Sequence, residues 1–207
     1  MILLFPRDPA FCRPSWTALA LGALFLFGCA HHVPPELKPA DAFMHHLRAL
    51  CGQAFAGRIV ANVPTATAPD PFSGKVLIAH VRECKPTQLR IPFHVGDDHS
   101  RTWVISEQST GLRLKHDHRH SDGSADILTQ YGGDSVDAGL ANRQEFPVDA
   151  DSIALFQRQN SAASVTNTWA FEIEPGKTLV YELARPGRLF RVEFDLSKAV
   201  PVPQPPW

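Results

Sequence analysis

The spacing of apolar and polar residues along this chain changes near residue 52. Before that point, residues 39–51 carry apolar side chains three and four positions apart, at Phe43, Leu47, Leu50 and Cys51. This spacing places them on one face of a helix, so we predict a short helix here with Asp41 as its N-cap. Beyond residue 52 apolar and polar positions alternate, which is typical of strands with one buried face.

About ten short segments of this alternating kind follow one another, separated by turn signals rich in Gly, Pro and Asp. The predicted strands are 54–61, 75–83, 88–96, 101–107, 112–120, 127–131, 141–146, 164–174, 178–184 and 189–196. Links of hairpin length favour a mainly β fold, an antiparallel meander that closes into a barrel and so removes exposed strand edges. A two-sheet sandwich is the alternative. The long break at 149–159 predicts one short helix capped by Asp149 or Asp151.

A short helix that leads into such a meander resembles the calycin barrels, the group that includes the lipocalins. The segment GQAFAG at 52–57 is similar to the Gly-x-Trp entry of that group's first strand, with Phe55 in the aromatic position. The resemblance implies an architecture that can enclose a small ligand, and it implies no particular activity.

The first 28 residues have the pattern of an export signal. Arg7 and Arg13 precede an uncharged run, 17–27, of 11 residues. A bilayer-spanning helix needs about 20 apolar residues, so the run fits the core of a signal peptide instead. It ends in Leu26-Phe27-Gly28-Cys29-Ala30, which resembles a bacterial lipobox. That resemblance implies cleavage before Cys29 and lipid attached to its thiol; an ordinary secretory leader is the alternative.

The lipobox sets the expected organisation of the chain. Residues 1–28 are the signal peptide, 29–40 a proline-rich linker that carries the lipid anchor, 41–197 one β-barrel domain, and 198–207 a proline-rich tail. Ala30 stands where an Asp marks retention in the inner membrane of well-studied lipoproteins. We therefore expect a protein of the bacterial cell envelope, anchored by lipid in the outer membrane.

Net charge excludes one class of partner. Loss of Arg7, Arg13 and Asp8 with the leader changes 20 basic and 21 acidic residues to 18 and 20. A nearly balanced domain has no electrostatic footprint for nucleic acid. The expected partners are the membrane, through the lipid anchor, and a small-molecule ligand or another envelope protein.

Four cysteines divide into three roles. Cys12 leaves with the leader and Cys29 carries the lipid, so Cys51 and Cys84 remain. In an oxidising compartment an even pair suggests a disulfide. Free thiols or a redox couple are the alternatives, although the pair lacks the Cys-x-x-Cys spacing of thioredoxin-like proteins.

The most unusual strand is 112–120, LRLKHDHRH. Alternation places its three histidines, His116, His118 and His120, on the apolar face with Leu112 and Leu114. Imidazoles two residues apart can converge on one ion, so this strand is a candidate site for Zn, Cu or Ni. A third ligand is expected from elsewhere, such as His80, His94 or Asp97, although the phase of His94 predicts an exposed side chain. Alternatively, the histidines only mark the wet end of a strand.

Other side chains are candidates for contact with a ligand inside the barrel. Trp103, Trp169 and His80 share faces with apolar neighbours, and so does Asn167, which needs a hydrogen-bonding partner if it is buried. Three arginines, Arg185, Arg188 and Arg191, flank a Pro-Gly turn. They can bind an anion, or they form the mixed-charge rim of a hairpin.

Four motifs together resemble a set of bacterial secreted proteins of unknown function, over roughly residues 48–197. They are Leu114–His120 (LKHDHRH), Tyr131-Gly132-Gly133, Arg143–Pro147 (RQEFP) and Arg185–Phe194 (RPGRLFRVEF). The resemblance implies no activity. The chain lacks a Gly-x-Ser-x-Gly elbow, a P-loop and a His-Glu-x-x-His motif.

The sequence therefore favours a non-enzymatic, lipid-anchored protein that binds a small ligand or partner through its barrel. One alternative is a metal-binding protein or metal-dependent enzyme that uses the histidine strand. Another is a structural or assembly lipoprotein that acts through an exposed apolar surface.

Overall fold

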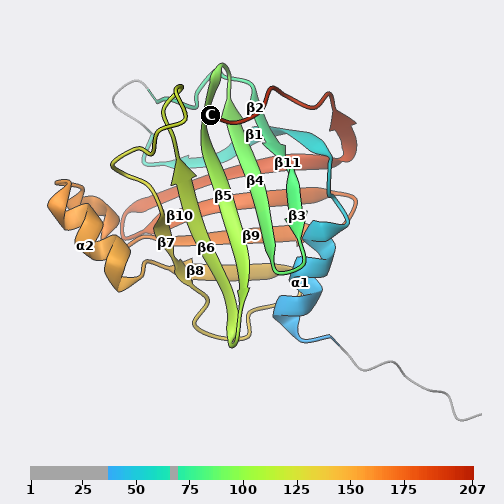
Figure 1. The fold of residues 1–207 in the computed structure, drawn as a ribbon, viewed down its shortest axis with the longest axis horizontal. Coiled ribbons are helices and arrows are strands. Elements are labelled where there is room, and N and C mark those ends of the chain that lie inside the picture. Colours follow the sequence, from blue (N-terminus) through green and yellow to red (C-terminus); the bar gives the residue numbers. More distant parts are fainter. Residues whose placement is uncertain (1–36, 66–69) are drawn as a thin grey trace, which may run out of the picture. The chain divides into compact units, whose positions relative to one another are not determined.

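The computed structural model describes residues 37–65 and 70–207, so the predicted leader and the predicted lipid site at Cys29 lie outside the described residues. Two α-helices, one 3-10 helix and eleven strands make up the described part (Figure 1). The helices are α1 (Pro39–Arg48), α2 (Ala150–Arg158) and η1 (Ala162–Ser164). The strands are β1 (Ala54–Val63), β2 (Leu77–His80), β3 (Glu83–Lys85), β4 (Gln88–Val95), β5 (Asp98–Gln108), β6 (Gly111–His118), β7 (Tyr131–Asp134), β8 (Arg143–Pro147), β9 (Thr168–Glu174), β10 (Thr178–Arg185) and β11 (Arg188–Val200).

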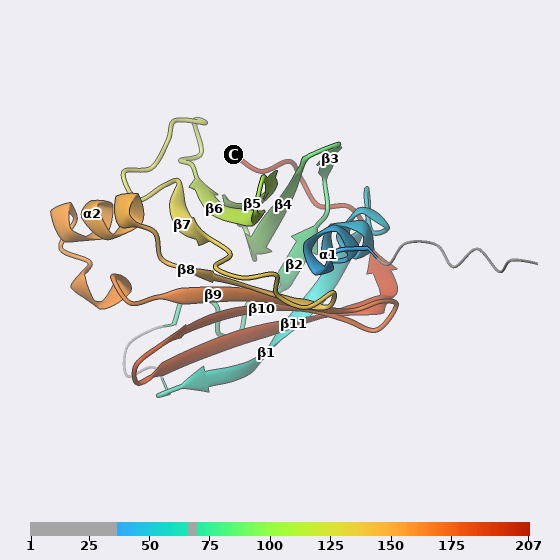
Figure 2. The same ribbon diagram turned by 90° about the horizontal axis from the view of Figure 1, so that it is seen from below.

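All the strands belong to one antiparallel sheet, in the order β7-β6-β5-β4-β2-β1-β11-β10-β9-β8, with β3 paired to β4. The sheet curls until it is nearly closed as a barrel, which confirms the predicted fold class. Strands β4 to β6 cross β9 to β11 at a steep angle, and the core lies between these two walls (Figure 2). Register shifts in β1, between Phe55 and Gly57 and between Ile59 and Ala61, let the sheet bend from one wall to the other.

The barrel has its seam between β7 and β8, the two ends of the sheet. At the seam the N–H of Asp149 donates to the carbonyl of Gly132 at 2.9 Å, and the N–H of Gly132 donates to Oγ of Ser152 in α2. A Cβ on Gly133 would lie 1.7 Å from the carbonyl oxygen of Pro147. In the sequence these two glycines indicate a turn, but both lie in β7. There another stretch of backbone passes too close to leave room for a Cβ.

Both helices close gaps in the barrel. Helix α1 buries Phe43 and Leu47 against the core, as their spacing predicts, and Met44 beside them. The predicted N-cap is wrong, because the helix begins at Pro39 after Lys38 and Asp41 lies within its first turn. Helix α2 begins at the predicted cap, because the Asp149 carboxylate accepts the N–H of Ser152 at 2.8 Å. The same carboxylate pairs with Nζ of Lys115 at 2.6 Å, so the cap also links α2 to β6.

The predicted disulfide is confirmed. Cys51, just after α1, is bonded to Cys84 in β3, and their Cα atoms are 6.3 Å apart. No helix among the described residues is long and apolar enough to cross a membrane.

Several predicted boundaries are wrong for identifiable reasons. The predicted strand 127–131 is a turn region, because the Asp126 carboxylate accepts the N–H of Leu128 and Gln130 has a φ of 56°. The predicted strand 75–83 is interrupted at Val81, whose N–H bonds to the carbonyl of Gln53. Strand β9 begins at 168 rather than 164, because η1 precedes it. Helix α1 begins at Pro39 and β11 ends at Val200.

Candidate functional site

A hollow of about 290 Å³ opens where one end of β5 and β6 meets the β10–β11 hairpin. We call it the aromatic chamber, because aromatic rings form most of its wall: Phe72, Phe93, Trp103, Tyr131, Tyr181 and Phe190. The rings pack in register, since Trp103 stacks on Phe93 with centroids 4.6 Å apart and on Tyr181 at 4.5 Å. Such a wall offers flat apolar surface to the body of a small ligand.

Three arginines line the same chamber. Arg101 is neutralised by the carboxylate of Asp98, and the guanidinium of Arg188 donates to Oδ1 of Asn62. Arg188 also helps to lower the pKa of Asp70. Arg185 and Arg188 differ from Arg101, because neither forms an ion pair within the described residues.

A histidine–tyrosine network forms the wall on the side of β6. Nδ1 of His116 lies 3.2 Å from the carbonyl of Tyr131, and only a protonated nitrogen can bond to a carbonyl. Nε2 of neutral His116 therefore accepts the hydroxyl of Tyr181 at 2.9 Å. Burial lowers the pKa of His116 to about 3 and that of His118 to about 4, with Arg101 adding to the effect on His118. Both rings are thus neutral at pH 7, and the positive charge of the chamber comes from its arginines.

A second hollow of about 310 Å³ adjoins the first, and the two share His118, Tyr131, Leu183 and Arg185. We call it the polar chamber, because its remaining wall includes Asp126, Ser161, Ser164 and Asn167, along with Trp169. Nη1 of Arg185 donates to Oδ1 of Asn167 at 3.1 Å. Arg185 therefore stands at the boundary of the two chambers.

The candidate ligand-binding residues fall into two groups. Trp103 lines the aromatic chamber, and Asn167 and Trp169 line the polar chamber. His80 lines neither chamber, because β2 turns Leu77 and Ala79 toward the core and His80 to the outer face of the sheet. His80 therefore does not face the barrel interior, where the sequence analysis placed it as a ligand contact.

The prediction that His94 is exposed is also wrong, because its side chain is only 2 % exposed. The C-terminal tail lies against the outer side of β4 and β5 in both views (Figures 1 and 2). The N–H of Trp207 bonds to the carbonyl of His99, and the rings of His99 and His94 are 4.6 Å apart. Alternation gives the face on which a side chain lies, but not whether another segment covers that face.

The structure brings two of the three predicted histidine ligands to one chamber and leaves the third outside it. His116 and His118 face the aromatic chamber, but His120 lies beyond the end of β6 and is exposed. Both ring nitrogens of His116 already have partners, and Nε2 of His118 lies 3.1 Å from the hydroxyl of Tyr131. Within residues 37–65 and 70–207, no group of three or more His, Cys, Asp or Glu side chains is arranged to hold a metal ion.

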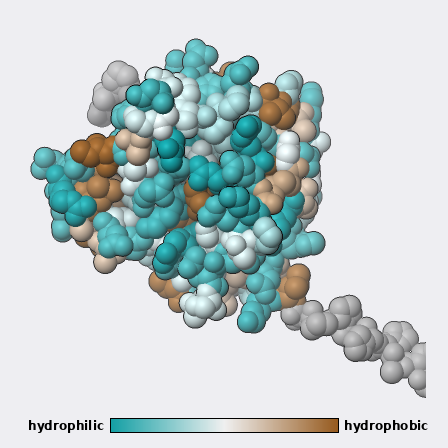
Figure 3. Space-filling view, viewed as in Figure 1, coloured by the Kyte–Doolittle hydropathy of each residue, from teal (hydrophilic) through white to brown (hydrophobic). Residues whose placement is uncertain are grey.

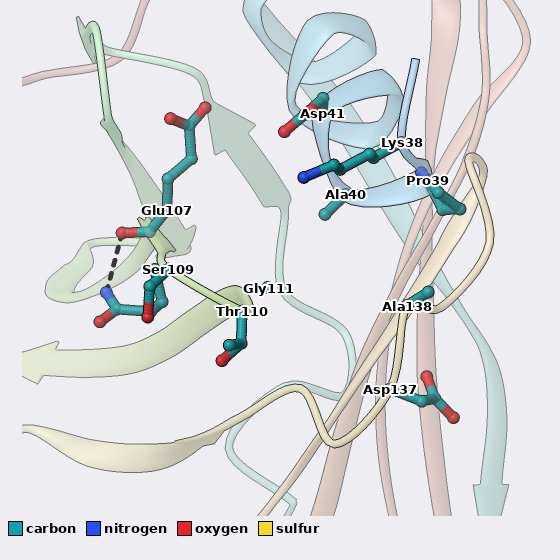
Figure 4. Close-up of a pocket in the computed structure, with 11 residues that line it drawn as sticks. Lys38, Pro39, Ala40, Asp41, Glu107, Ser109, Thr110, Gly111, Asp137 and Ala138 are labelled. Atoms are coloured by element: carbon teal, nitrogen blue, oxygen red, sulfur yellow. Dashed lines mark hydrogen bonds between the residues drawn. The ribbon is translucent and has the colours of Figure 1, made fainter. Parts of the chain in front are cut away.

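A larger hollow of about 450 Å³ lies at the opposite end of β5 and β6, beside the start of α1 (Figure 4). Charges of both signs surround it, from Lys38, Asp41, Glu107 and Asp137, and no aromatic side chain lines it. It gathers none of the predicted site residues. On the face drawn in Figure 3, hydrophilic residues predominate and apolar ones form separate small patches.

No family model, curated protein or solved structure matches this chain, so the candidate site is defined by its own geometry.

Sequence reasoning missed the role of three residues that the chambers bring together, Arg101, Tyr131 and Tyr181. It also left the role of Arg185 open between an anion site and a plain hairpin rim. A usable signal was present, because Arg185 continues the inward phase of Tyr181 and Leu183 in β10. An arginine in phase with a core face, at the end of a strand, is expected at the mouth of a barrel.

Proposed function

We propose that this protein is a lipid-anchored binding protein of the bacterial envelope that takes a small amphipathic anion into the aromatic chamber. The observation that carries the proposal is Arg185, a guanidinium without an ion pair among the described residues, beside a wall of stacked aromatic rings. An apolar body would lie on the rings, and a carboxylate would complete the pairing of the arginine.

Charge in the chamber favours an anion over a neutral or cationic ligand. His116 and His118 are neutral at pH 7, since burial lowers both pKa values far below 7. The carboxylate of Asp98 is engaged by Arg101, which leaves Arg185 and Arg188 as cations whose hydrogen-bond partners, among them Asn167 and Asn62, are neutral. A guanidinium held between low-dielectric walls attracts an anion more strongly than one in bulk water.

Volume sets the size of the ligand. At roughly 30 Å³ for each water-sized volume, the chamber of about 290 Å³ holds about ten non-hydrogen atoms. Octanoate is a chain of this size with one terminal carboxylate. At about 0.5 kcal/mol per atom, its binding free energy would be about −5 kcal/mol, a Kd of roughly 0.2 mM.

The test is a calorimetric titration of purified protein with octanoate, with octan-1-ol as the matched neutral compound. We expect octanoate to bind in the sub-millimolar range and octan-1-ol to bind at least about tenfold more weakly, because a charge-assisted hydrogen bond contributes about 1.5–3 kcal/mol. Arg185→Gln should remove the preference for the anion. Arg158→Gln, at an exposed arginine in α2 outside both chambers, is the control. Equal affinity for acid and alcohol would refute the proposal.

Membrane attachment is the second part of the proposal. It is supported by the lipobox at Leu26–Cys29 in the sequence and by the Cys51–Cys84 disulfide, a bond that persists in oxidising compartments.

A further inference from the structure

We infer that the ligand extends from the aromatic chamber into the polar chamber, and that it belongs to the N-acyl amino acids. This inference rests on the proposed function. The two hollows have four lining residues in common, including Arg185, so a ligand whose apolar end occupies one is at the entrance of the other. A plain fatty acid would leave the polar chamber, of about 310 Å³, without an occupant.

Hydrogen-bond donors of the polar chamber point to the chemistry of that second part. Oδ1 of Asn167 accepts from Arg185, so the amide Nδ2 lies on the opposite side, and it donates to no described residue. The hydroxyl of Ser164 also has no hydrogen-bond partner in the described part of the chain. Asn167, Ser164 and Arg185 together suit a carboxylate with a neighbouring amide carbonyl.

An acyl amino acid meets these requirements. The acyl chain lies on the rings of Trp103 and Tyr181, the carboxylate pairs with Arg185, and the amide and the amino-acid side chain reach Asn167 and Ser164. The amino acid must be small, because the polar chamber holds about ten water-sized volumes at roughly 30 Å³ each.

The experiment compares N-octanoyl-L-serine with octanoate by calorimetric titration at neutral pH. Two neutral hydrogen bonds of about 0.7 kcal/mol each correspond to about tenfold, so we expect N-octanoyl-L-serine to bind about tenfold more tightly. Ser164→Leu fills the polar chamber and should bring the ratio of the two affinities to about one. Ser109→Leu, at an exposed serine in the β5–β6 turn, should keep the ratio near ten.

Asn167→Asp is the second variant, nearly identical in shape. It places a carboxylate beside Arg185 and removes the Nδ2 donors, so the ratio should again fall to about one. Equal affinity of the two compounds for the unmodified protein would overturn the inference while leaving octanoate binding, and the proposed function, intact. Failure of both compounds to bind would overturn both.

Discussion

Removal of the disulfide tests whether the link between the end of α1 and β3 stabilises the barrel. The bond joins residues separated by 33 positions. In the chain-entropy account, a closed loop of this length restricts the unfolded chain by about 3.7 kcal/mol near room temperature. The double variant Cys51→Ala/Cys84→Ala should therefore lose about that free energy of unfolding. Its Tm should fall by about 7–15 °C, at about 2–4 °C per kcal/mol for a domain of this size.

Urea denaturation followed by tryptophan fluorescence measures this loss, with and without reductant. The unmodified protein in reductant should match the double variant, because both lack only the covalent link. The double variant itself should not respond to reductant. A loss below about 1 kcal/mol, with an unchanged dependence on urea, would refute the loop-closure reasoning, because the unfolded chain would then be restricted by something else.

Three further outcomes are expected, two from the structure and one from the sequence. Gly133→Ala brings a Cβ within 1.7 Å of a backbone oxygen, so it should lower the free energy of unfolding by about 3 kcal/mol and speed hydrogen exchange at the Asp149 amide. Gly74→Ala, with open space around the new Cβ, should lower it by only about 1 kcal/mol, as measured by urea denaturation. Burial lowers the pKa of His94 from 6.5 to about 4, so the unfolded chain binds more protons than the folded chain between these pH values. The free energy of unfolding should therefore fall as pH drops from 6.5 toward 4, by about 2 kcal/mol at pH 5 for this group. His94→Leu should flatten that slope in urea denaturation across pH, and an unchanged slope would contradict the assignment. Cys29→Ser should abolish lipid labelling and release the protein from membranes, whereas continued attachment would place the anchor elsewhere.

Most of the fold was predictable because alternation is a local signal with a direct physical cause. Strands β4 and β10 lie within one residue of their predicted bounds, since each carries a clear period of two over seven or more residues. Strand β7 was misplaced because its glycines serve a contact with Pro147, which is distant in sequence. A local pattern contains no information on which backbone will pass close by.

The candidate site was only partly predictable, for a related reason. Alternation placed Trp103, His116 and Trp169 correctly on inward faces. Which of these side chains would border a hollow depends on how the two walls of the barrel cross, and no single strand contains that information. His94 failed for the opposite reason, because its burial comes with the C-terminal tail that lies against the outer face.

The arginines show that the face of the strand on which a residue lies could have distinguished candidate binding residues from residues in surface ion pairs. Arg90 and Arg191 are out of phase with the core faces of β4 and β11, and both pair with carboxylates outside the barrel. Arg101 and Arg185 are in phase with Trp103 and Tyr181, and both border the aromatic chamber. All four side chains carry the same charge, so the two groups differ only in whether the side chain lies on the core face of its strand. A cation that continues a core face at a strand end costs desolvation free energy unless a partner compensates it. Arg185 has only the neutral amide oxygen of Asn167 and no carboxylate partner among the described residues, which supports the proposal of an anionic ligand.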